Sequence, residues 1–395
     1  MNNFFISKFK DIINKKSVKK LTRKILIASH ASGTPGGPVE KLQSYLSKKN
    51  IVYTIKHPLY PKSSTKSEIY FNKKRFIFKL PFFIQYPLEG IITTFILLKH
   101  RTPIDLAVCF DPLSFFNVYF FNFFYNVKKI IYYNLDYSIT RFNNPFLNNI
   151  YHFLNRFAYE HCSYLFILRE SILDKIDPGK KFRSKNFIVG QTVSSIRTRG
   201  KKNIKNNSIL YAGAIGNSVD FKPLITALVK LKKNKIFFNM DIFGKENDKG
   251  KLRKMILINK LEKNVFFKGP AEVNELTKKI IPNYKIGVSP YMLKKDKKSP
   301  DYLYQGSLIA AKVVDYIAGG LPVIATRVNP AFDDIEKYQF GFNAKTENDW
   351  FIAIKSLLTD QNLYKKYQKN ALKFAKKFDE NIVFGPIFKK ILEEN

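Results

Sequence analysis

The sequence predicts an α/β protein made of two doubly wound domains, each a parallel sheet with helices on both faces. Short buried strands alternate with amphipathic helices along most of the 395 residues, which is the pattern of parallel sheets. A polar, basic stretch without periodicity, residues 197–208, interrupts this alternation and predicts a linker. We therefore expect two Rossmann-like units that face each other across a central cleft, with ligand groups at the carboxyl ends of their strands.

The first unit begins with a short apolar strand at residues 24–29, a glycine-rich loop and a helix over 39–48. Asp111 and Asp136 follow two later strands, so both are expected at the carboxyl edge of the sheet. The remaining predicted strands of this unit are 51–55, 105–110, 129–134, 163–168 and 185–189.

The second unit repeats the pattern, with a helix over 221–232 and a mostly helical tail from 349 to 394. Its predicted strands are 208–212, 237–243, 264–268, 285–290 and 322–325. We divide the chain into an N-terminal domain (23–200), a C-terminal domain (201–375) and a last helix (376–395) that returns to the N-terminal domain. Residues 1–22 form a basic amphipathic lead-in, either a membrane-surface helix or one that packs on the first domain.

The chain is strongly basic, with 68 Lys and Arg against 31 Asp and Glu and a net charge of +37. Nucleic-acid binding, attraction to an anionic membrane or acidic substrate, and a compositional bias towards lysine each account for such an excess. The lysines are spread along the whole chain and no zinc, helix-turn-helix or RNA-binding motif stands out. We therefore expect an anionic membrane surface, and no nucleic acid, as a partner.

Cysteine usage and the apolar runs point to the cytoplasm. Cys109 and Cys162 lie in apolar surroundings without a metal-type or redox-type partner in the sequence, which is typical of reduced core cysteines. No signal-peptide pattern is visible, and the apolar runs near 90–98 and 115–125 are too short or too polar to span a bilayer. We expect a cytoplasmic protein that is peripheral on the inner face of the plasma membrane.

The most informative segment is residues 311–326, AKVVDYIAGGLPVIAT, which predicts a helix, a glycine stop and a buried strand. Lys312 and Asp315 are three residues apart and share one face of this helix. A helix start favours a phosphate, Lys312 can neutralise it, and Asp315 can accept hydrogen bonds from ribose hydroxyls. The alternative is a surface ion pair between the two side chains, which would contribute little.

This segment resembles the lysine-x-x-acid-Tyr-x-Ala-x-Gly-x-Pro-Val pattern of GT-B glycosyltransferases, in particular the retaining family 4 enzymes of bacterial surface-polysaccharide synthesis. The glycine turn within residues 209–221 and the segments 265–276 and 286–291 are similar to the same family, and residues 132–143 resemble it more weakly. The resemblance covers most of the chain and is strongest from about 208 to 345.

The resemblance implies that Asp315 holds the donor ribose and that Lys312 faces the donor phosphates. Two departures stand out: Ser307 occupies a position where many relatives have glutamate, and no Arg and Lys follow the turn at Gly213. Ser307 and Gly213 remain donor-site candidates, and neutralisation of the phosphates is expected to fall on Lys312 together with Lys294, Lys295 or Arg327.

In the first domain, Asp136 matches a position where relatives often have histidine, and it is a catalytic candidate together with Asp111. Both acids have the alternative of ordinary strand-end turns. Gly36 and Gly37 allow the backbone to approach an acceptor or diphosphate, or else form only a tight turn.

The resemblance implies transfer of a sugar from a nucleotide sugar to a glycan or lipid-linked acceptor, retaining and independent of metal. No cofactor or metal is expected, because no Asp-x-Asp pair follows a strand and the five histidines show no ligand spacing. The alternatives are a nucleic-acid-binding protein, a GT-B nucleotide-sugar epimerase, or a catalytically silent relative. The sequence leaves the sugar, the base and the acceptor open.

Overall fold

The structure is a computed structural model that describes residues 22–393 with internal gaps. The gaps are 32–36, 59–65, 72–73, 80–81, 100–102, 136, 139–140, 143, 169, 178, 182–184, 194–195, 197–206, 217, 273–274 and 294–308. The lead-in at 1–21, most of the predicted linker, and the site candidates Gly36, Asp136, Lys294, Lys295 and Ser307 lie outside the described residues.

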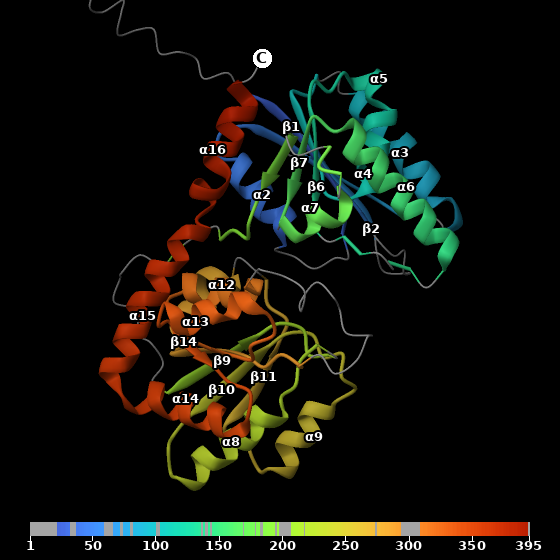
Figure 1. Cartoon of the computed structure of the whole chain (residues 1–395). Coiled ribbons are helices and arrows are strands. Elements are labelled where there is room, and N and C mark those ends of the chain that lie inside the picture. Colours follow the sequence, from blue (N-terminus) through green and yellow to red (C-terminus); the bar gives the residue numbers. More distant parts are fainter. Residues whose placement is uncertain are drawn as a thin grey trace, which may run out of the picture.

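The first sheet has eight strands in the order β4-β3-β2-β1-β5-β6-β7-β8 (Figure 1). The strands from β2 through β1 to β8 pair in parallel, whereas β3 and β4 add an antiparallel hairpin at the edge of β2. The strands are β1 (Lys24–Ala31), β2 (Ile51–Pro58), β3 (Ser67–Phe71), β4 (Lys74–Phe78), β5 (Leu106–Cys109), β6 (Ile130–Asn134), β7 (Tyr164–Ile167) and β8 (Asn186–Ile188).

Helices cover both faces of this sheet, because successive residues of its buried strands point to opposite sides. Leu26 and Ala28 of β1 belong to a core with α4 and α6, whereas Ile25 and Ile27 belong to a core with α2 and α16. The helices of this part are α2 (Pro38–Leu46), α3 (Phe82–Lys99), α4 (Pro112–Phe120), α5 (Asn122–Tyr125), α6 (Pro145–His161) and α7 (Glu170–Ile176).

The second sheet has six parallel strands in the order β11-β10-β9-β12-β13-β14. Its strands are β9 (Ser208–Ala212), β10 (Asn239–Phe243), β11 (Val265–Gly269), β12 (Ile286–Ser289), β13 (Val323–Ala325) and β14 (Gly341–Asn343). The strand order reverses between β9 and β12, as it does between β1 and β5 in the first sheet. Such switch points open a crevice at the carboxyl ends of the strands, where α/β proteins bind ligands.

Two helical layers enclose the second sheet. One core joins α8 and α14 around the buried Trp350, and the other joins α12 and α15. The helices are α8 (Lys222–Lys233), α9 (Lys251–Ile258), the π-helix η2 (Leu276–Ile280), the 3₁₀ helices η3 (Ile281–Asn283), η4 (Pro330–Asp333) and η5 (Lys376–Phe378), and α12 (Ala311–Ala318), α13 (Asp334–Lys337), α14 (Glu347–Thr359), α15 (Gln361–Ala375) and α16 (Glu380–Glu393).

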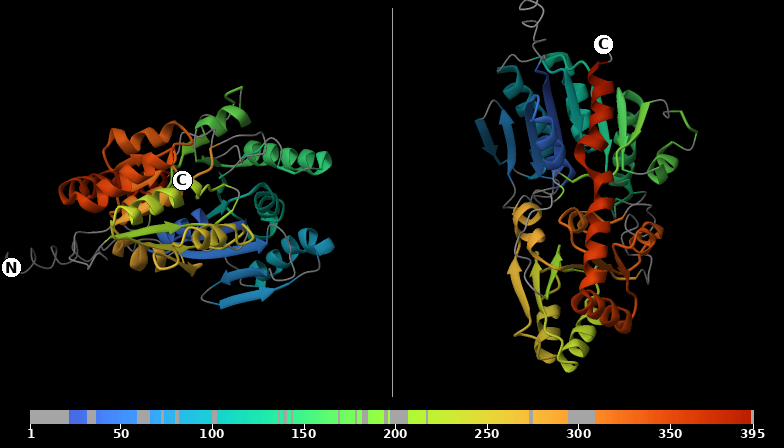
Figure 2. Two further views of the ribbon diagram at one scale, coloured as in Figure 1. Left: turned by 90° about the horizontal axis from the view of Figure 1, so that it is seen from below. Right: turned by 90° about the vertical axis from the view of Figure 1, so that its left-hand side faces the viewer.

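The last helix, α16, leaves the second domain and packs on the first sheet, so that the end of the chain runs along both domains (Figure 2). Phe384, Phe388 and Ile391 are buried in the core that contains Ile25. Lys129 Nζ of the first domain donates a hydrogen bond to the Ile391 carbonyl at 2.9 Å.

The predicted fold class, two Rossmann-like α/β domains, is confirmed. The hairpin β3–β4 and the short strand β14 were missed, since edge strands of three to five residues carry weak periodicity. Cys109 and Cys162 are buried free thiols, and burial raises the pKa of Cys162 to about 12. No helix in the described part of the chain has the length and apolar character needed to cross a membrane.

Candidate functional site

Helix α12 forms at the switch point of the second sheet and presents Lys312 and Asp315 on one side. Val313, Val314 and Ile317 are buried in the core, which leaves the face of Lys312 and Asp315 turned away from it. The helix ends at a glycine pair whose second member, Gly320, has a φ of +78°, a conformation that favours glycine. The predicted order of helix, glycine stop and buried strand is observed in this segment.

The ammonium group of Lys312 lies between two tyrosine rings. Its Nζ is 4.7 Å from the ring centre of Tyr211 and 4.7 Å from that of Tyr291. It also donates a weak hydrogen bond, 3.4 Å long, to the Tyr211 hydroxyl. Among the described residues no carboxylate forms an ion pair with Lys312, and burial lowers the pKa of its amine to about 8. The site therefore holds a cation that the described side chains leave without a countercharge.

Close packing fixes α12 against the carboxyl ends of β9 and β12. The Tyr316 hydroxyl accepts a hydrogen bond from the Ala212 amide at 2.7 Å and donates to the Val288 carbonyl at 3.3 Å. The Tyr316 ring lies over Gly287, where a Cβ would come within 2.5 Å of it. Gly213 is equally close to the site, since a Cβ added there would lie 2.9 Å from Lys312 Nζ. The predicted candidates Gly213 and Lys312 are thus brought together.

Asp315 does not pair with Lys312. Its carboxylate instead accepts from Lys41 Nζ of α2, in the first domain, at 3.3 Å. Burial raises the pKa of Asp315, and the nearby Lys41 ammonium acts in the opposite direction. This ion pair connects the carboxyl edges of the two sheets, because α2 follows β1 and α12 precedes β13.

Arg327 lies apart from this cluster. Its guanidinium forms a bidentate ion pair with Asp333, one arm of which measures 2.9 Å, and both side chains are exposed. It borders a hollow of about 350 Å³ beyond the ends of β13 and β14. The other lining residues are Leu293, Asn343, Ala344, Lys345 and Asp349. Leu293 is the last described residue before the gap that contains Lys294 and Lys295.

The switch point of the first sheet contains a buried histidine between two carboxylates. His30 Nδ1 donates to Asp111 Oδ1 at 2.8 Å, and His30 Nε2 donates to Glu89 Oε1 at 2.5 Å. The His30 side chain is 1% exposed and that of Glu89 is not exposed. Since both ring nitrogens donate to carboxylates, this geometry requires the imidazolium form.

The positive charge of His30 is compensated within the protein by two carboxylates. Burial lowers the pKa of His30, but Asp111 and Glu89 outweigh it and raise that pKa to about 10. Burial and the charge of His30 together lower the pKa of the neighbouring His57 to about 3, so His57 is neutral. Burial raises the pKa of Asp111, but the opposing charge of His30 and hydrogen bonds from Ser114 hold it well below its usual range.

Asp111 is also the N-cap of α4. Its carboxylate accepts from the Ser114 amide at 2.8 Å, the Ser114 hydroxyl at 2.7 Å and the His30 amide at 2.6 Å, besides the His30 ring. These contacts match the turn interpretation of Asp111, and its catalytic role stays a prediction. Gly37, the N-cap of α2, has a φ of −72°, and an added Cβ would meet only ordinary contact at 3.6 Å.

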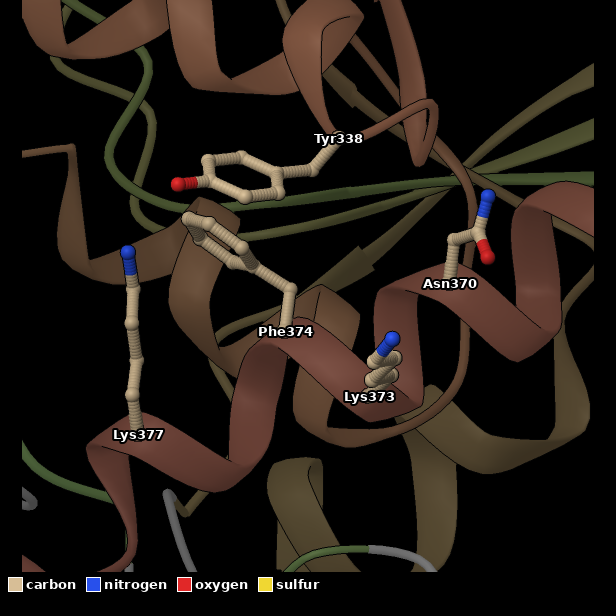
Figure 3. Close-up of a pocket in the computed structure, with 5 residues that line it drawn as sticks. All are labelled: Tyr338, Asn370, Lys373, Phe374 and Lys377. Atoms are coloured by element: carbon tan, nitrogen blue, oxygen red, sulfur yellow. The ribbon is translucent and has the colours of Figure 1, made fainter.

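A separate hollow of about 310 Å³ lies on the outside of the second domain (Figure 3). Its walls are Tyr338, Asn370, Lys373, Phe374 and Lys377, none of which the sequence predicts as a site residue. Lys377 Nζ lies 3.5 Å from the centre of the Phe374 ring. In the described residues no three His, Cys, Asp or Glu side chains gather as metal ligands would.

Sequence reasoning missed five residues at the two switch points. They are His30, Glu89, Lys41, Tyr211 and Tyr291. Glu89 carried a signal, because it is a lone carboxylate in the otherwise apolar α3 and such a group is seldom buried without a partner. Tyr211 and Tyr291 carried a weaker one, since each lies at or near the end of a predicted strand.

Comparison with protein families and solved structures agrees with the architecture. Residues 194–374 match the family model of glycosyl transferases group 1. The chain is similar to S. aureus TarM, solved with fondaparinux, α-GlcNAc-glycerol and UDP, at 17% identity and a TM-score of 0.52; the match covers 82% of this chain but only 61% of TarM. Comparison with curated protein sequences gives no match.

Two further structures match over nearly their whole length. Anabaena HepE, solved with UDP and glucose, is 14% identical with a TM-score of 0.61, and the match covers 93% of this chain and 99% of HepE. The lipopolysaccharide outer core galactosyltransferase WaaB is 12% identical with a TM-score of 0.55, covering 94% and 100%. The chain thus has the GT-B fold of these structures, and its residues 194–374 match the glycosyl transferases group 1 model.

Proposed function

We propose that the protein transfers a sugar from a UDP-sugar to a glycan or lipid-linked acceptor in surface-polysaccharide synthesis. The observation that carries this proposal is the Lys312 ammonium, which is partly buried at the switch point and has no countercharge among the described residues. A nucleotide diphosphate supplies the missing charge, and desolvation strengthens its attraction to Lys312. TarM and HepE, which bind UDP by their descriptions, support UDP as the nucleotide.

The chemistry required of Lys312 is stabilisation of the leaving group. When the bond between the anomeric carbon and the diphosphate breaks, negative charge develops on the β-phosphate, and the ammonium is positioned to neutralise it together with amides of the first turn of α12. Asp315 would accept hydrogen bonds from the ribose hydroxyls in place of, or beside, its bond from Lys41. We propose that the reaction is retaining and metal-independent.

The acceptor side of the proposal lies in the first domain, residues 23–200, and the donor side in residues 201–375. Nothing in the backbone at Gly37 requires a glycine, since its φ is −72° and a Cβ would fit there. This supports a ligand as the reason for the glycine pair Gly36–Gly37. Asp136 remains a proposed acceptor or catalytic group, with Asp111 as the other catalytic candidate.

We also propose that the enzyme works in the cytoplasm, peripheral on the inner face of the plasma membrane. The net charge of +37 supports attraction to anionic lipid headgroups. WaaB, which acts on lipopolysaccharide by its description, supports an acceptor of the cell surface.

A thermal-shift screen with UDP-, GDP-, ADP- and CMP-sugars tests the donor. A ligand at 100 times its Kd stabilises the folded protein by about 2.7 kcal/mol, so UDP-sugars should raise the unfolding midpoint clearly above the others. If no nucleotide sugar raises the midpoint, the proposal is wrong. For a sugar that binds and is transferred, the anomeric configuration of the product by NMR tests retention, and activity in EDTA tests metal independence.

A further inference from the structure

The outer surface of helices α3 to α6 carries an unusual group of exposed apolar side chains, which we call the aromatic face. Phe123 is 91% exposed, and Phe95 and Phe146 are each 69% exposed. Of the 21 large apolar side chains exposed among the described residues, 11 lie on these four helices. The members are Ile91, Phe95, Leu98, Tyr119, Phe120, Phe123, Phe124, Phe146, Leu147, Ile150 and Phe153.

The helices that carry the aromatic face adjoin one another. Helix α4 contacts α5 and α6, and α3 contacts α5, so the four helices form a single layer on one side of the first sheet (Figure 1). Single exposed apolar residues are normal, whereas 11 of them on four adjoining helices indicate a binding surface. The sheet side of the layer is already occupied by the buried residues Phe115, Val118 and Ala158, so only the outer side is available.

Few of the described acidic groups are exposed around the aromatic face, and the chain as a whole is strongly basic, which favours an anionic partner. The carboxylates of the described residues on these helices are Glu89, which is buried against His30, and Glu160, which pairs with Arg156. The exposed cations described there are Arg156, at 79%, and Lys128, just after α5, at 63%; Lys128 Nζ lies 3.5 Å from Asp105 Oδ1. A second copy of this chain would bring another net charge of +37 to the contact, which opposes self-association. Anionic lipid provides both an apolar interior and negative headgroups.

The aromatic face also reaches the functional edge of the first sheet. Helix α6 connects β6 to β7, two neighbouring parallel strands, so its first residues Phe146 and Leu147 lie towards the carboxyl ends of the strands. That edge contains the switch point with His30 and Asp111 and is linked to the second domain by Lys41 and Asp315. A bilayer bound to the aromatic face would therefore lie beside the carboxyl edge of the first sheet.

We propose that the aromatic face docks the enzyme on an anionic lipid bilayer, with its phenylalanines entering the interfacial region. This surface is distinct from the basic lead-in at residues 1–22. Docking brings the carboxyl edge of the first sheet to the bilayer. An acceptor with a lipid tail could then reach the site while its tail stays in the bilayer. The acceptor part of this inference rests on the proposed function, whereas the docking does not depend on catalysis.

Vesicle sedimentation of the full chain tests the docking. We expect binding to vesicles of phosphatidylcholine with phosphatidylglycerol, and weaker binding to phosphatidylcholine alone. The triple variant Phe120→Ser, Phe123→Ser, Phe124→Ser should lose at least about tenfold in partitioning, because three apolar side chains no longer enter the bilayer. The matched control is Phe237→Ser, Leu257→Ser, Ile258→Ser, which removes three comparably exposed side chains of the second domain and should change partitioning less than twofold.

A fluorescence measurement supports the same test without loss of apolar surface. Trp350, the sole tryptophan, is buried in the second domain, so Phe123→Trp adds a local probe whose emission brominated lipids should quench. Phe237→Trp should remain unquenched. Quenching of neither probe, or unchanged partitioning of the triple variant, overturns the inference. If binding is lost only when residues 2–21 are deleted, the lead-in and not the aromatic face is responsible for docking. If the wild type is a dimer and the triple variant is a monomer, the aromatic face is a self-association surface.

The outcomes separate this inference from the proposed function. The triple variant should keep the thermal shift with UDP, since its substitutions lie far from α12. A protein that binds vesicles through the aromatic face but responds to no nucleotide sugar would overturn the proposed function alone.

Discussion

The switch points of the two sheets each contain a cation, but the groups that surround the two cations differ. In the first domain, His30 lies between Glu89 and Asp111, and both of its ring nitrogens donate to carboxylates. In the second domain, Lys312 lies between the rings of Tyr211 and Tyr291, and no described carboxylate pairs with it. Burial lowers the pKa of Lys312, whereas the two acids raise that of His30.

This difference indicates that the charge of His30 stabilises the fold, whereas the charge of Lys312 binds a ligand. Removing a cation that neutralises two buried acids leaves uncompensated charge inside the protein, so the His30 cluster acts on stability. Removing an ammonium that only a bound anion would neutralise should stabilise the ligand-free protein, because an uncompensated charge is lost, and should weaken binding of the anion. The comparison therefore predicts opposite responses to the loss of each cation.

The largest effect is expected from His30→Gln. Glu89 and Asp111 would lose their shared cation, and we expect the free energy of unfolding near neutral pH to fall by about 3–5 kcal/mol in urea titrations. His161→Gln, which changes an exposed histidine that bonds only the Phe157 carbonyl, is the control and should cost little. A loss below about 1 kcal/mol for His30→Gln, within the range of ordinary surface changes, would contradict the structural role of the cluster.

The same variant has a defined pH signature. The pKa of His30 is raised from its usual 6.5 to about 10, so its stabilisation is complete below the lower value and disappears as the pH rises towards the upper one. The difference in unfolding free energy between wild type and His30→Gln should thus be greater near pH 6 than near pH 9.

Lys312→Met should instead weaken donor binding. A hydrogen bond to a charged group contributes about 1.5–3 kcal/mol, so the Kd for UDP in calorimetry should rise by about 10- to 150-fold, with unchanged or higher thermal stability. Lys285→Met is the matched control, because Lys285 is a buried lysine, with its Nζ bonded to the Leu358 carbonyl at 3.0 Å. Equal UDP affinity in wild type and Lys312→Met would remove Lys312 from the donor site.

The pH dependence of UDP binding sharpens the comparison further. The pKa of Lys312 is about 8 in the free protein, and a bound diphosphate would raise it. Binding therefore takes up a proton above pH 8, and affinity should fall by up to about tenfold per pH unit there. Lys312→Met should lose this dependence, and an unchanged slope would assign the titration to another group.

Gly213→Ala tests the position of the Lys312 ammonium. The new Cβ would lie 2.9 Å from Lys312 Nζ, whose flexible end can shift, and the φ of +154° at Gly213 strains the backbone of the variant as well. We expect about fivefold weaker UDP binding, roughly 1 kcal/mol, because Lys312 remains but is displaced. Gly190→Ala, where an added Cβ meets nothing within 4 Å, should leave folding and UDP binding unchanged and is the control for the addition of a methyl group.

The smallest effect is expected at the pair between the two domains. A double-mutant cycle of Lys41→Met and Asp315→Asn should give a coupling of about 0.5–1 kcal/mol in unfolding, because both side chains remain partly exposed, at 13% and 17%. Saturating UDP should reduce this coupling if the ribose takes the Asp315 carboxylate. A coupling that UDP leaves unchanged would place the ribose elsewhere.

The sequence predicted local features well and contacts between distant residues poorly. Strand β9 was placed at its observed bounds, and Lys312 and Gly213 were both identified as candidates before the structure brought them together. The cluster of His30, Glu89 and Asp111 joins positions 59 and 81 residues apart, and no local pattern encodes such distances. The pairing of Asp315 with Lys41, and not with its neighbour Lys312, depends in the same way on how the domains meet.

The return of α16 to the first sheet has a consequence for synthesis on the ribosome. The core of the first domain includes Phe384, Phe388 and Ile391, which are made after every strand of both sheets. The second domain, in contrast, takes all its strands from residues 208–343 and can complete its sheet earlier. The first domain therefore completes its core after the strands of the second domain have been made, and the apolar surface of Ile25 and Ile27 stays exposed until α16 has been synthesised.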